Sequence, residues 1–148
     1  MQKNRSKGFT LIELLVVIAI IGILSAIVLA SLNTARTKGS DAATQSDLST
    51  VQTEAEIFYG GTGANSYGTT GSTCAAAGSV FTDGVIAKAI ANMTTTAGAA
   101  PVCGNTPAAY AIEAKMNANG GYWCVDSTGT SAAKVTALVA GATVCPAT

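Results

Sequence analysis

An unbroken apolar segment near the start of the chain limits what the sequence can fold into. From Phe9 to Leu32, 24 residues contain a single charged side chain, Glu13. As an α-helix this segment is roughly 36 Å long, enough to cross a hydrocarbon core about 30 Å thick with some tilt. Apolar residues occupy every side of such a helix, unlike the amphipathic helix of a protein surface. The segment therefore predicts a membrane span.

The charges around this segment are unevenly distributed. Three of the eight basic residues, Lys3, Arg5 and Lys7, lie in the first eight positions, and residues 9–148 have five basic and eight acidic side chains, a net charge of −3. The positive-inside rule places the N-terminus in the cytoplasm and the remainder outside. Zero net charge overall argues against direct nucleic-acid binding. The absence of His excludes an imidazole base and a His-ligated metal site.

A cleaved secretory signal peptide is the main alternative to a retained span. The small residues between Ala26 and Ala30 offer a cleavage site. Two features oppose this interpretation: the apolar run is longer than a signal-peptide core, and it contains Glu13. A carboxylate at membrane depth costs about 2.5–3.5 kcal/mol on insertion scales and usually has a partner and a function. We therefore expect a retained span.

Residues 7–24, KGFTLIELLVVIAIIGIL, closely resemble the N-terminal signature of type IV prepilins and of type II secretion pseudopilins. A short basic leader ends at Gly8, Phe9 follows, and Glu13 comes four residues after Phe9. The resemblance covers about 25 residues at high identity, and the rest of the chain resembles the family in layout. It implies a single-pass inner-membrane protein, with its N-terminus in the cytoplasm, that later becomes part of an extracellular filament.

The resemblance also assigns roles to individual residues. A prepilin peptidase is expected to cleave between Gly8 and Phe9 and to methylate the new Phe9 amine. Glu13 is expected to pair with the Phe9 ammonium of a neighbouring subunit and to set its register, with the Thr10 hydroxyl in support. The implied partners are further copies in a homo-oligomeric filament, the peptidase, the pilus assembly machinery and, before assembly, the membrane.

One departure from the family pattern lies at Ala30, where many type IV pilins have proline and pseudopilins often do not. Gly22 matches a common family glycine, and glycine destabilises a helix by roughly 1 kcal/mol relative to alanine. Gly22 and Gly39 are therefore the expected soft points of the helix. At Gly39 the sequence is compatible with a bend and with a regular helix.

The helical pattern continues beyond Leu32 in amphipathic form. One stripe collects apolar side chains at i, i+3, i+7 and i+10, namely Leu48, Val51, Ala55 and Phe58. Gly60-Gly61 is a stop signal. A single helix from Thr10 to about Tyr59, roughly 75 Å long, is expected.

The second half of the chain predicts a small head. After a loop at 60–73, Thr82-Asp83 can cap a short helix, with a loop again from 94 to 101. The buried face of that helix is expected to carry Val85, Ile86, Ala89, Ile90 and Met93. Alternation predicts a half-buried strand at 109–116, followed by a turn at 117–121 and strands at 122–126 and 135–139.

The predicted fold class is thus α+β and pilin-like, a long N-terminal helix on a small antiparallel sheet. Its expected segments are a leader at 1–8, a transmembrane or filament-core helix at 9–32, its amphipathic half at 33–59, a variable loop with a short helix at 60–107, and the sheet with a C-terminal tail at 108–148.

The four cysteines all lie on the exported side, where oxidation is expected. Three pairings are open. We favour Cys74–Cys103, around the short helix, and Cys124–Cys145, between the sheet and the tail. A metal site is the poorer alternative, because no two cysteines are closer than 21 positions and His is absent.

No catalytic constellation is evident, so a non-enzymatic protein without a cofactor or metal is expected. The turn after Asp126 offers too few carboxylates for calcium. Three functions are compatible with the residues: a type IV pilus subunit, which we favour, a type II secretion pseudopilin, and a membrane-tethered binding module that never polymerises.

Overall fold

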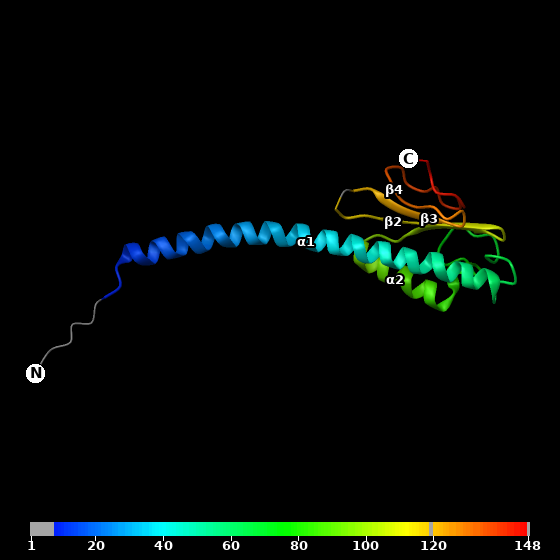
Figure 1. Cartoon of the computed structure of the whole chain (residues 1–148), viewed down its shortest axis with the longest axis horizontal. Helices are drawn as coiled ribbons and strands as arrows, with labels where there is room; N and C mark the ends of the chain where they lie inside the picture. The colour runs from blue at the N-terminus through cyan, green and yellow to red at the C-terminus, as the bar shows by residue number, and fades with distance from the viewer. Residues whose placement is uncertain (1–7, 119, 148) are drawn as a thin grey trace, which may run out of the picture. The chain divides into compact units, whose positions relative to one another are not determined.

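The computed structural model describes residues 8–118 and 120–147. Its elements in chain order are α1 (Leu11–Gly60), a 3-10 turn (Val80–Thr82), α2 (Gly84–Ala97), β1 (Val102–Thr106), β2 (Ala109–Lys115), β3 (Tyr122–Asp126) and β4 (Ser131–Lys134) (Figure 1). The strands form one antiparallel sheet in the order β1-β2-β3-β4. The predicted α+β class, a long N-terminal helix with a small antiparallel sheet, is confirmed.

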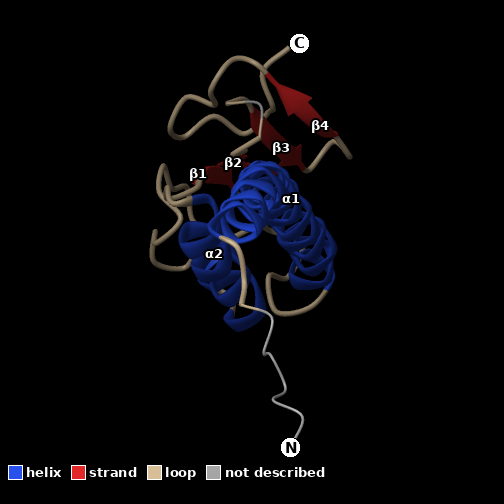
Figure 2. Ribbon diagram, turned by 90° about the vertical axis from the view of Figure 1, so that its left-hand side faces the viewer, coloured by secondary structure: helices blue, strands red, loops and turns tan. Residues whose placement is uncertain are grey.

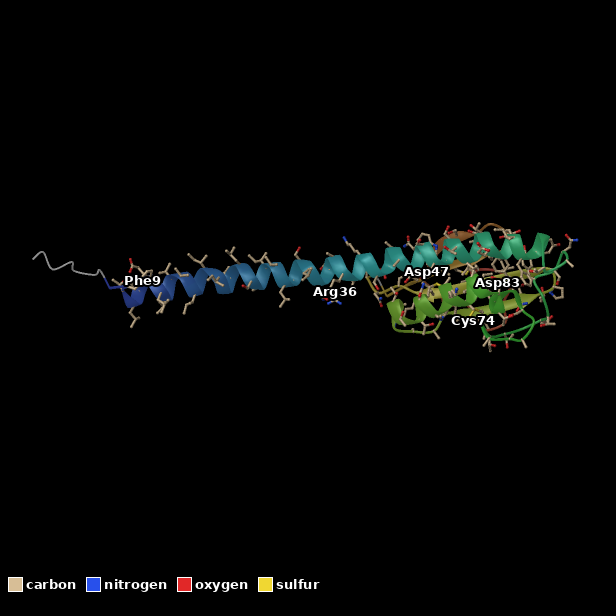
Figure 3. The ribbon with its side chains drawn as sticks, turned by 90° about the horizontal axis from the view of Figure 1, so that it is seen from below. Phe9, Arg36, Asp47, Cys74 and Asp83 are labelled. Carbon is tan, nitrogen blue, oxygen red and sulfur yellow. A yellow bond between two sulfur atoms is a disulfide. The ribbon has the colours of Figure 1, made fainter. Side chains whose placement is uncertain are left out.

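The chain divides into two units after Arg36, and α1 contributes to both. In the first unit, described from Gly8, three non-helical residues precede α1. The large apolar side chains from Phe9 to Leu32 are 48–84% exposed and project on several sides of the helix (Figure 3). Among the described residues, α1 is the one helix long and apolar enough to cross a membrane. So large an apolar surface needs lipid or other protein to cover it.

In the second unit, helices and sheet form two layers. Figure 2 shows α2 and the second half of α1 on one face of the sheet. The predicted stripe of α1 packs there, with Leu48, Val51 and Ala55 fully buried and Phe58 partly buried at the margin. The sheet contributes Tyr110, Ile112, Ala114 and Val125 to the same core.

The prediction that the strand at 109–116 is half-buried is wrong. Its second face is covered as well, because the chain after β4 folds across it and forms a smaller core of Ala111, Cys124, Leu138 and Cys145. Glu113, on that same face, is only 1% exposed. Only Lys115, at the end of β2, remains exposed as predicted.

The predicted strand at 135–139 is also wrong. β4 instead spans Ser131–Lys134, and its last residue pairs with Tyr122, where β3 begins. Residues after Lys134 have no partner strand, so the Val-rich segment stays irregular. It buries Leu138 and leaves Val135 and Val139 84% and 75% exposed.

Strand β1 lies inside the segment expected to be loop and short helix. Its sequence, Val-Cys-Gly-Asn-Thr, does not alternate between apolar and polar residues. Two of its residues, Gly104 and Asn105, instead fix the strand through contacts with distant parts of the chain. A Cβ atom on Gly104 would overlap the carbonyl oxygen of Ala142, so glycine is needed under the C-terminal segment. The Asn105 amide donates to the carbonyls of Tyr67 and Thr69, at 3.0 and 2.8 Å, and holds the loop before α2.

Helix α2 begins as predicted and ends later. The Asp83 side chain caps it by accepting a hydrogen bond from the main-chain N–H of Val85 at 2.9 Å. Ile86, Ala89 and Met93 are buried, Ile90 is partly buried, and Val85 is 46% exposed, so its assignment to the buried face is wrong. The helix continues to Ala97, where Gly98 adopts the left-handed conformation that ends it.

Candidate functional site

The candidate processing site lies where α1 begins. Gly8, Phe9 and Thr10 are exposed and non-helical, and Phe9 is 84% exposed. The peptide bond between Gly8 and Phe9 therefore lies in an exposed, non-helical segment directly before the helix. The basic residues Lys3, Arg5 and Lys7 lie outside the described residues.

Thr10 and Glu13 form a capping box. The Glu13 carboxylate accepts hydrogen bonds from the Thr10 main-chain N–H at 2.9 Å and from its hydroxyl at 2.7 Å. In return, the Glu13 N–H donates to the Thr10 hydroxyl oxygen at 3.3 Å. These reciprocal bonds satisfy donors that the first turn of a helix leaves unpaired. The structure thus brings together two of the predicted assembly residues, within one chain.

The sequence itself predicts this capping role of Glu13, whereas the family resemblance assigns Glu13 a role between subunits. Thr10-Leu11-Ile12-Glu13 fits the pattern Ser/Thr-x-x-Glu, which is a helix-start signature in its own right. Glu13 therefore has a local partner before any second subunit is present.

The two expected soft points are both helical. α1 runs without interruption through Gly22 and Gly39, and a Cβ atom on either would meet open space. Of the two conformations left open at Gly39, the structure has the regular helix. Whether either glycine softens the helix stays a prediction.

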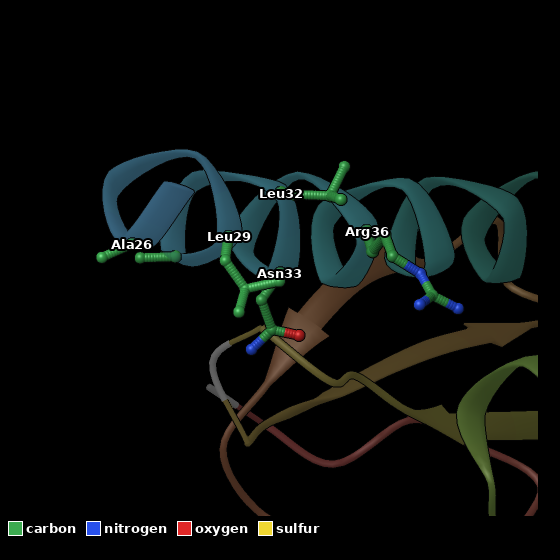
Figure 4. A pocket seen from close by; sticks show the side chains of 6 residues that line it. Ala26, Leu29, Leu32, Asn33 and Arg36 are labelled. Atoms are coloured by element: carbon green, nitrogen blue, oxygen red, sulfur yellow. The ribbon is translucent and has the colours of Figure 1, made fainter. Parts of the chain in front are cut away.

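A shallow groove follows α1 toward the end of the first unit. The groove is lined by the small side chains of Ala26 and Ala30 and by Leu29 and Leu32. Asn33 and Arg36 form the polar end of the groove. Leu29 and Asn33 project from the same side of the helix (Figure 4). Small side chains at such positions allow another helix to approach closely.

The cysteines form two disulfides in the second unit. Cys74 is bonded to Cys103, and Cys124 to Cys145. These are the pairs that the sequence favours. The first ties the loop before α2 to β1, and the second ties the end of the chain to β3.

Buried carboxylates make further ties between irregular segments and the sheet or helix. Asp41, in α1, accepts hydrogen bonds from the main-chain N–H groups of Asn117 and Ala118, at 2.6 and 2.9 Å. Both oxygens of Glu113 accept from the N–H of Leu138, at 2.9 and 3.0 Å. Asp41 therefore holds the β2–β3 turn, and Glu113 holds the C-terminal segment at Leu138.

The two acids of the sheet differ in protonation behaviour. Burial raises the pKa of Glu113, and the single N–H of Leu138 opposes this only in part. Burial also acts to raise the pKa of Asp126, but hydrogen bonds from Thr128, Cys145 and Thr130 outweigh it, and the net effect is a lowered pKa. Asp126 thus ends its strand as a turn-forming acid: its oxygens accept bonds from Thr128, Thr130 and Cys145.

Within the described part of the chain, no group of three or more His, Cys, Asp or Glu side chains is placed to hold a metal ion. All four cysteine sulfurs are in disulfides.

The N-terminal part of the chain matches a known family model. Residues 3–29 match the family model described as "Prokaryotic N-terminal methylation motif", the prepilin signature of type IV pilins and pseudopilins. Neither a curated protein nor a solved structure matches the chain.

The motif and the fold together support a pilin-like or pseudopilin protein. The chain carries the prepilin signature on an exposed apolar helix, followed by an antiparallel sheet. This class implies processing by a prepilin peptidase and assembly into pili or pseudopili. It points to a structural subunit, anchored in the inner membrane before assembly, rather than to an enzyme.

Proposed function

We propose that the chain is a structural subunit of an extracellular type IV pilus, polymerised through the first half of α1. One observation carries the proposal: a carboxylate, Glu13, stands at the start of an apolar helix whose surface has no cover within its own unit. A wholly apolar helix would suffice as a membrane anchor. The charged Glu13 side chain has a free-energy cost at membrane depth, and this cost favours a role for Glu13 in docking another subunit.

Processing would create the partner of that carboxylate. Hydrolysis of the Gly8–Phe9 bond adds water across the amide, leaving a carboxylate on Gly8 and an amine on Phe9. A methyl group from an activated methyl donor then replaces one proton of that amine, which stays cationic. The Phe9 ammonium of an incoming subunit would neutralise Glu13 of its neighbour, because an unpaired buried ion of either sign is costly.

Helix packing would supply the remaining stabilisation. The exposed apolar side chains from Phe9 to Leu32 leave the lipid and pack against other copies, and the groove along Ala26 and Ala30 admits a neighbouring helix. The disulfide-bonded heads would then form the outer surface of the fibre.

The test replaces Glu13 with Gln, which has nearly the same shape and no charge. We expect Glu13→Gln to be processed at Phe9 and to yield at least tenfold less sheared surface filament, since the ionic partner of the Phe9 ammonium is lost. Glu56→Gln, an exposed acid of the second unit, is the matched control. Filament yield equal to that of the unaltered chain would reject the docking role of Glu13.

A type II secretion pseudopilin is the second candidate, favoured by Ala30 in place of a helix proline and by the unbroken α1. A pseudopilin would be processed in the same way but would form a short periplasmic filament. Its processed chain would stay with the cell envelope after shearing.

A further inference from the structure

Strand β4 is an outer strand of the sheet, and one of its edges has no partner strand. Among the described residues, β4 pairs with β3 alone, and no isolated bridge or other main-chain hydrogen bond reaches Ser131, Ala132 or Ala133. At the opposite edge of the sheet, the loop before α2 covers β1 through two main-chain bonds between Gly71 and Asn105, both at 2.9 Å. An uncovered edge presents unpaired N–H and C=O groups to another chain.

The register shows which residue of β4 directs its main-chain groups outward. In an antiparallel ladder, hydrogen-bonded pairs alternate with pairs that are not hydrogen-bonded. The Asp126 N–H donates to the Thr130 carbonyl oxygen at 3.2 Å, so this pair is hydrogen-bonded. The Trp123–Ala133 pair lies three steps further along the ladder and is therefore not hydrogen-bonded. The N–H and C=O groups of Ala133 consequently point away from β3, toward the free edge.

A recess of about 340 Å³ opens beside this edge, on the side of the sheet that faces α1. Its sheet wall includes Trp123, whose indole N–H donates to the Ser131 hydroxyl at 3.2 Å, and Ala133, directly opposite on β4. Ala133 is exposed and has only a methyl side chain, so the space beside the indole is unfilled. α1 forms the other wall with Asp41 and Gln45, which share one side of the helix because they are four residues apart.

The recess is bordered by the carboxylate of Asp41. One oxygen of this carboxylate accepts from the N–H of Asn117 at 2.6 Å and the other from that of Ala118 at 2.9 Å, so each oxygen keeps a second acceptor position. Asp41 is 9% exposed and has no ion-pair partner among the described residues. Lys134 also borders the recess, but strand alternation directs its side chain to the opposite face from that of Ala133. The recess therefore favours a cationic group that donates hydrogen bonds.

We propose that β4 and this recess bind an extended peptide segment of another protein, with an arginine or lysine side chain in the recess. A peptide residue opposite Ala133 would exchange two main-chain hydrogen bonds with it, as a strand added to a sheet edge does. Because paired residues share a face, the side chain of that peptide residue would lie over the recess. A guanidinium group would donate to the unused acceptor positions of Asp41 and lie against the indole of Trp123.

Two other occupants satisfy fewer of these groups. A free amine would meet the carboxylate but leave the outward N–H and C=O of Ala133 unpaired. A second copy that pairs through its own β4 would satisfy the edge, but its recess-facing residues, Ser131 and Ala133, bring no cation to Asp41. The proposed peptide site goes beyond the filament function and does not rest on it.

The test measures peptide binding to the full processed chain in detergent micelles. The fluorescence of Trp123, the single tryptophan of the chain, reports on the recess itself. The parent probe is the acetylated and amidated peptide Ser-Thr-Val-Arg-Val-Thr-Ser. One matched peptide has citrulline, which is neutral and similar in shape, in place of arginine. Another has a methyl group on the main-chain nitrogen of arginine, which removes the donor that would face Ala133.

Two variants of the chain test the same contacts from the other side. Ala133→Leu fills the recess, and Asp41→Asn removes its negative charge. Ala87→Leu, at an exposed alanine of α2, is the matched control for Ala133→Leu. Near-ultraviolet circular dichroism verifies that each variant is folded.

We expect the parent peptide to bind, and citrulline to weaken binding by about 5- to 20-fold through the lost charged hydrogen bonds. The N-methyl group should weaken binding by at least about fivefold. Ala133→Leu should weaken it by about tenfold, and Ala87→Leu should leave it unchanged. Asp41→Asn should bind the arginine and citrulline peptides within about twofold of each other, because the interacting pair is then absent from both complexes.

Several results would overturn the proposal. Equal binding of the arginine and citrulline peptides to the unaltered chain would reject recognition by Asp41, and this comparison decides the point even where Asp41→Asn does not fold. Equal binding of the N-methyl peptide would reject strand pairing. Binding of agmatine, a free guanidinium compound, as tightly as the peptide would indicate a small-molecule site. A chain that binds no peptide at about 1 mM, and forms a dimer that Ala133→Leu disperses, would indicate a second copy as the occupant.

These results are independent of filament formation, because micelles hold the chain unassembled. A failure of peptide binding would leave the Glu13→Gln filament assay unaffected, and a failure of that assay would leave the peptide site intact.

Discussion

Asp126 and Cys145 are joined by a hydrogen bond that lies beside the Cys124–Cys145 disulfide. The Asp126 carboxylate accepts a 2.9 Å hydrogen bond from the main-chain N–H of Cys145, and the Cys145 side chain is bonded to Cys124, two residues before Asp126. One hydrogen bond and one covalent bond therefore hold the end of the chain against β3. This C-terminal segment covers the second face of the sheet, so its attachment governs the stability of the head.

Replacing Asp126 with Asn tests the hydrogen-bonded part of this attachment. An amide offers one acceptor oxygen instead of two and adds donors, so it cannot serve both the turn and Cys145. We expect a loss of about 1–3 kcal/mol in the free energy of unfolding. Urea unfolding of the full chain in micelles, followed by near-ultraviolet circular dichroism, reports this value because Trp123 and all four tyrosines lie in the second unit. Glu54→Gln, on α1, should change it by less than about 0.5 kcal/mol.

The pH dependence of stability should have two opposed contributions. The lowered pKa of Asp126 means that the unfolded chain binds its proton more tightly, so stability is lost as pH falls through the folded pKa. The raised pKa of Glu113 has the reverse sign: stability falls as pH rises from the ordinary glutamate value through the folded one. Melting temperatures between pH 2 and pH 8 should show Asp126→Asn flattening the acid limb and Glu113→Gln flattening the decline above it. Unchanged curves for both variants would contradict this assignment.

Asp41 ties the second half of α1 to the turn between β2 and β3. Asp41→Ala leaves the N–H groups of Asn117 and Ala118 without acceptors and should cost about 1–3 kcal/mol. The amides of these two residues should then exchange with solvent much faster, while those of β2 change little. Exchange of both amides at the unaltered rate would show that the carboxylate does not hold the turn.

The two disulfides should protect different segments. Removing Cys124–Cys145 as a double Ser variant should open residues 135–147 to limited proteolysis. Removing Cys74–Cys103 should open the loop at 61–79 instead. Each removal should cost about 2–4 kcal/mol. Mapping the first cleavage sites by mass spectrometry separates the two outcomes, and cleavage at the same site in both variants would argue against separate roles.

Elements with strong local signals could be predicted from the sequence. The apolar run and the stripe of Leu48, Val51 and Ala55 fix α1, and Asp83 marks the start of α2. These signals depend on helical period and capping, both of which act within a few residues. The prepilin signature is likewise local, because the matched motif lies within residues 3–29.

Elements defined by distant contacts could not be predicted in this way. β1 depends on Gly104 beneath Ala142 and on Asn105 bound to the preceding loop. β4 ends at Lys134 because its partner strand β3 begins at Tyr122. The Val-rich segment after Lys134 has the composition of a strand but no strand to pair with, so its sequence predicts a strand that does not form. The burial of Glu113 depends on a tail 25 residues away. In each case the deciding partner is remote in sequence.

The most direct test of a pilus subunit is the intact mass of protein sheared from the cell surface. The account predicts an abundant chain that begins at methylated Phe9 and carries two disulfides, with residues 1–8 removed. A processed chain that stays in the envelope would favour the pseudopilin. A full-length chain with an intact Gly8–Phe9 bond, found only in the membrane, would contradict the account.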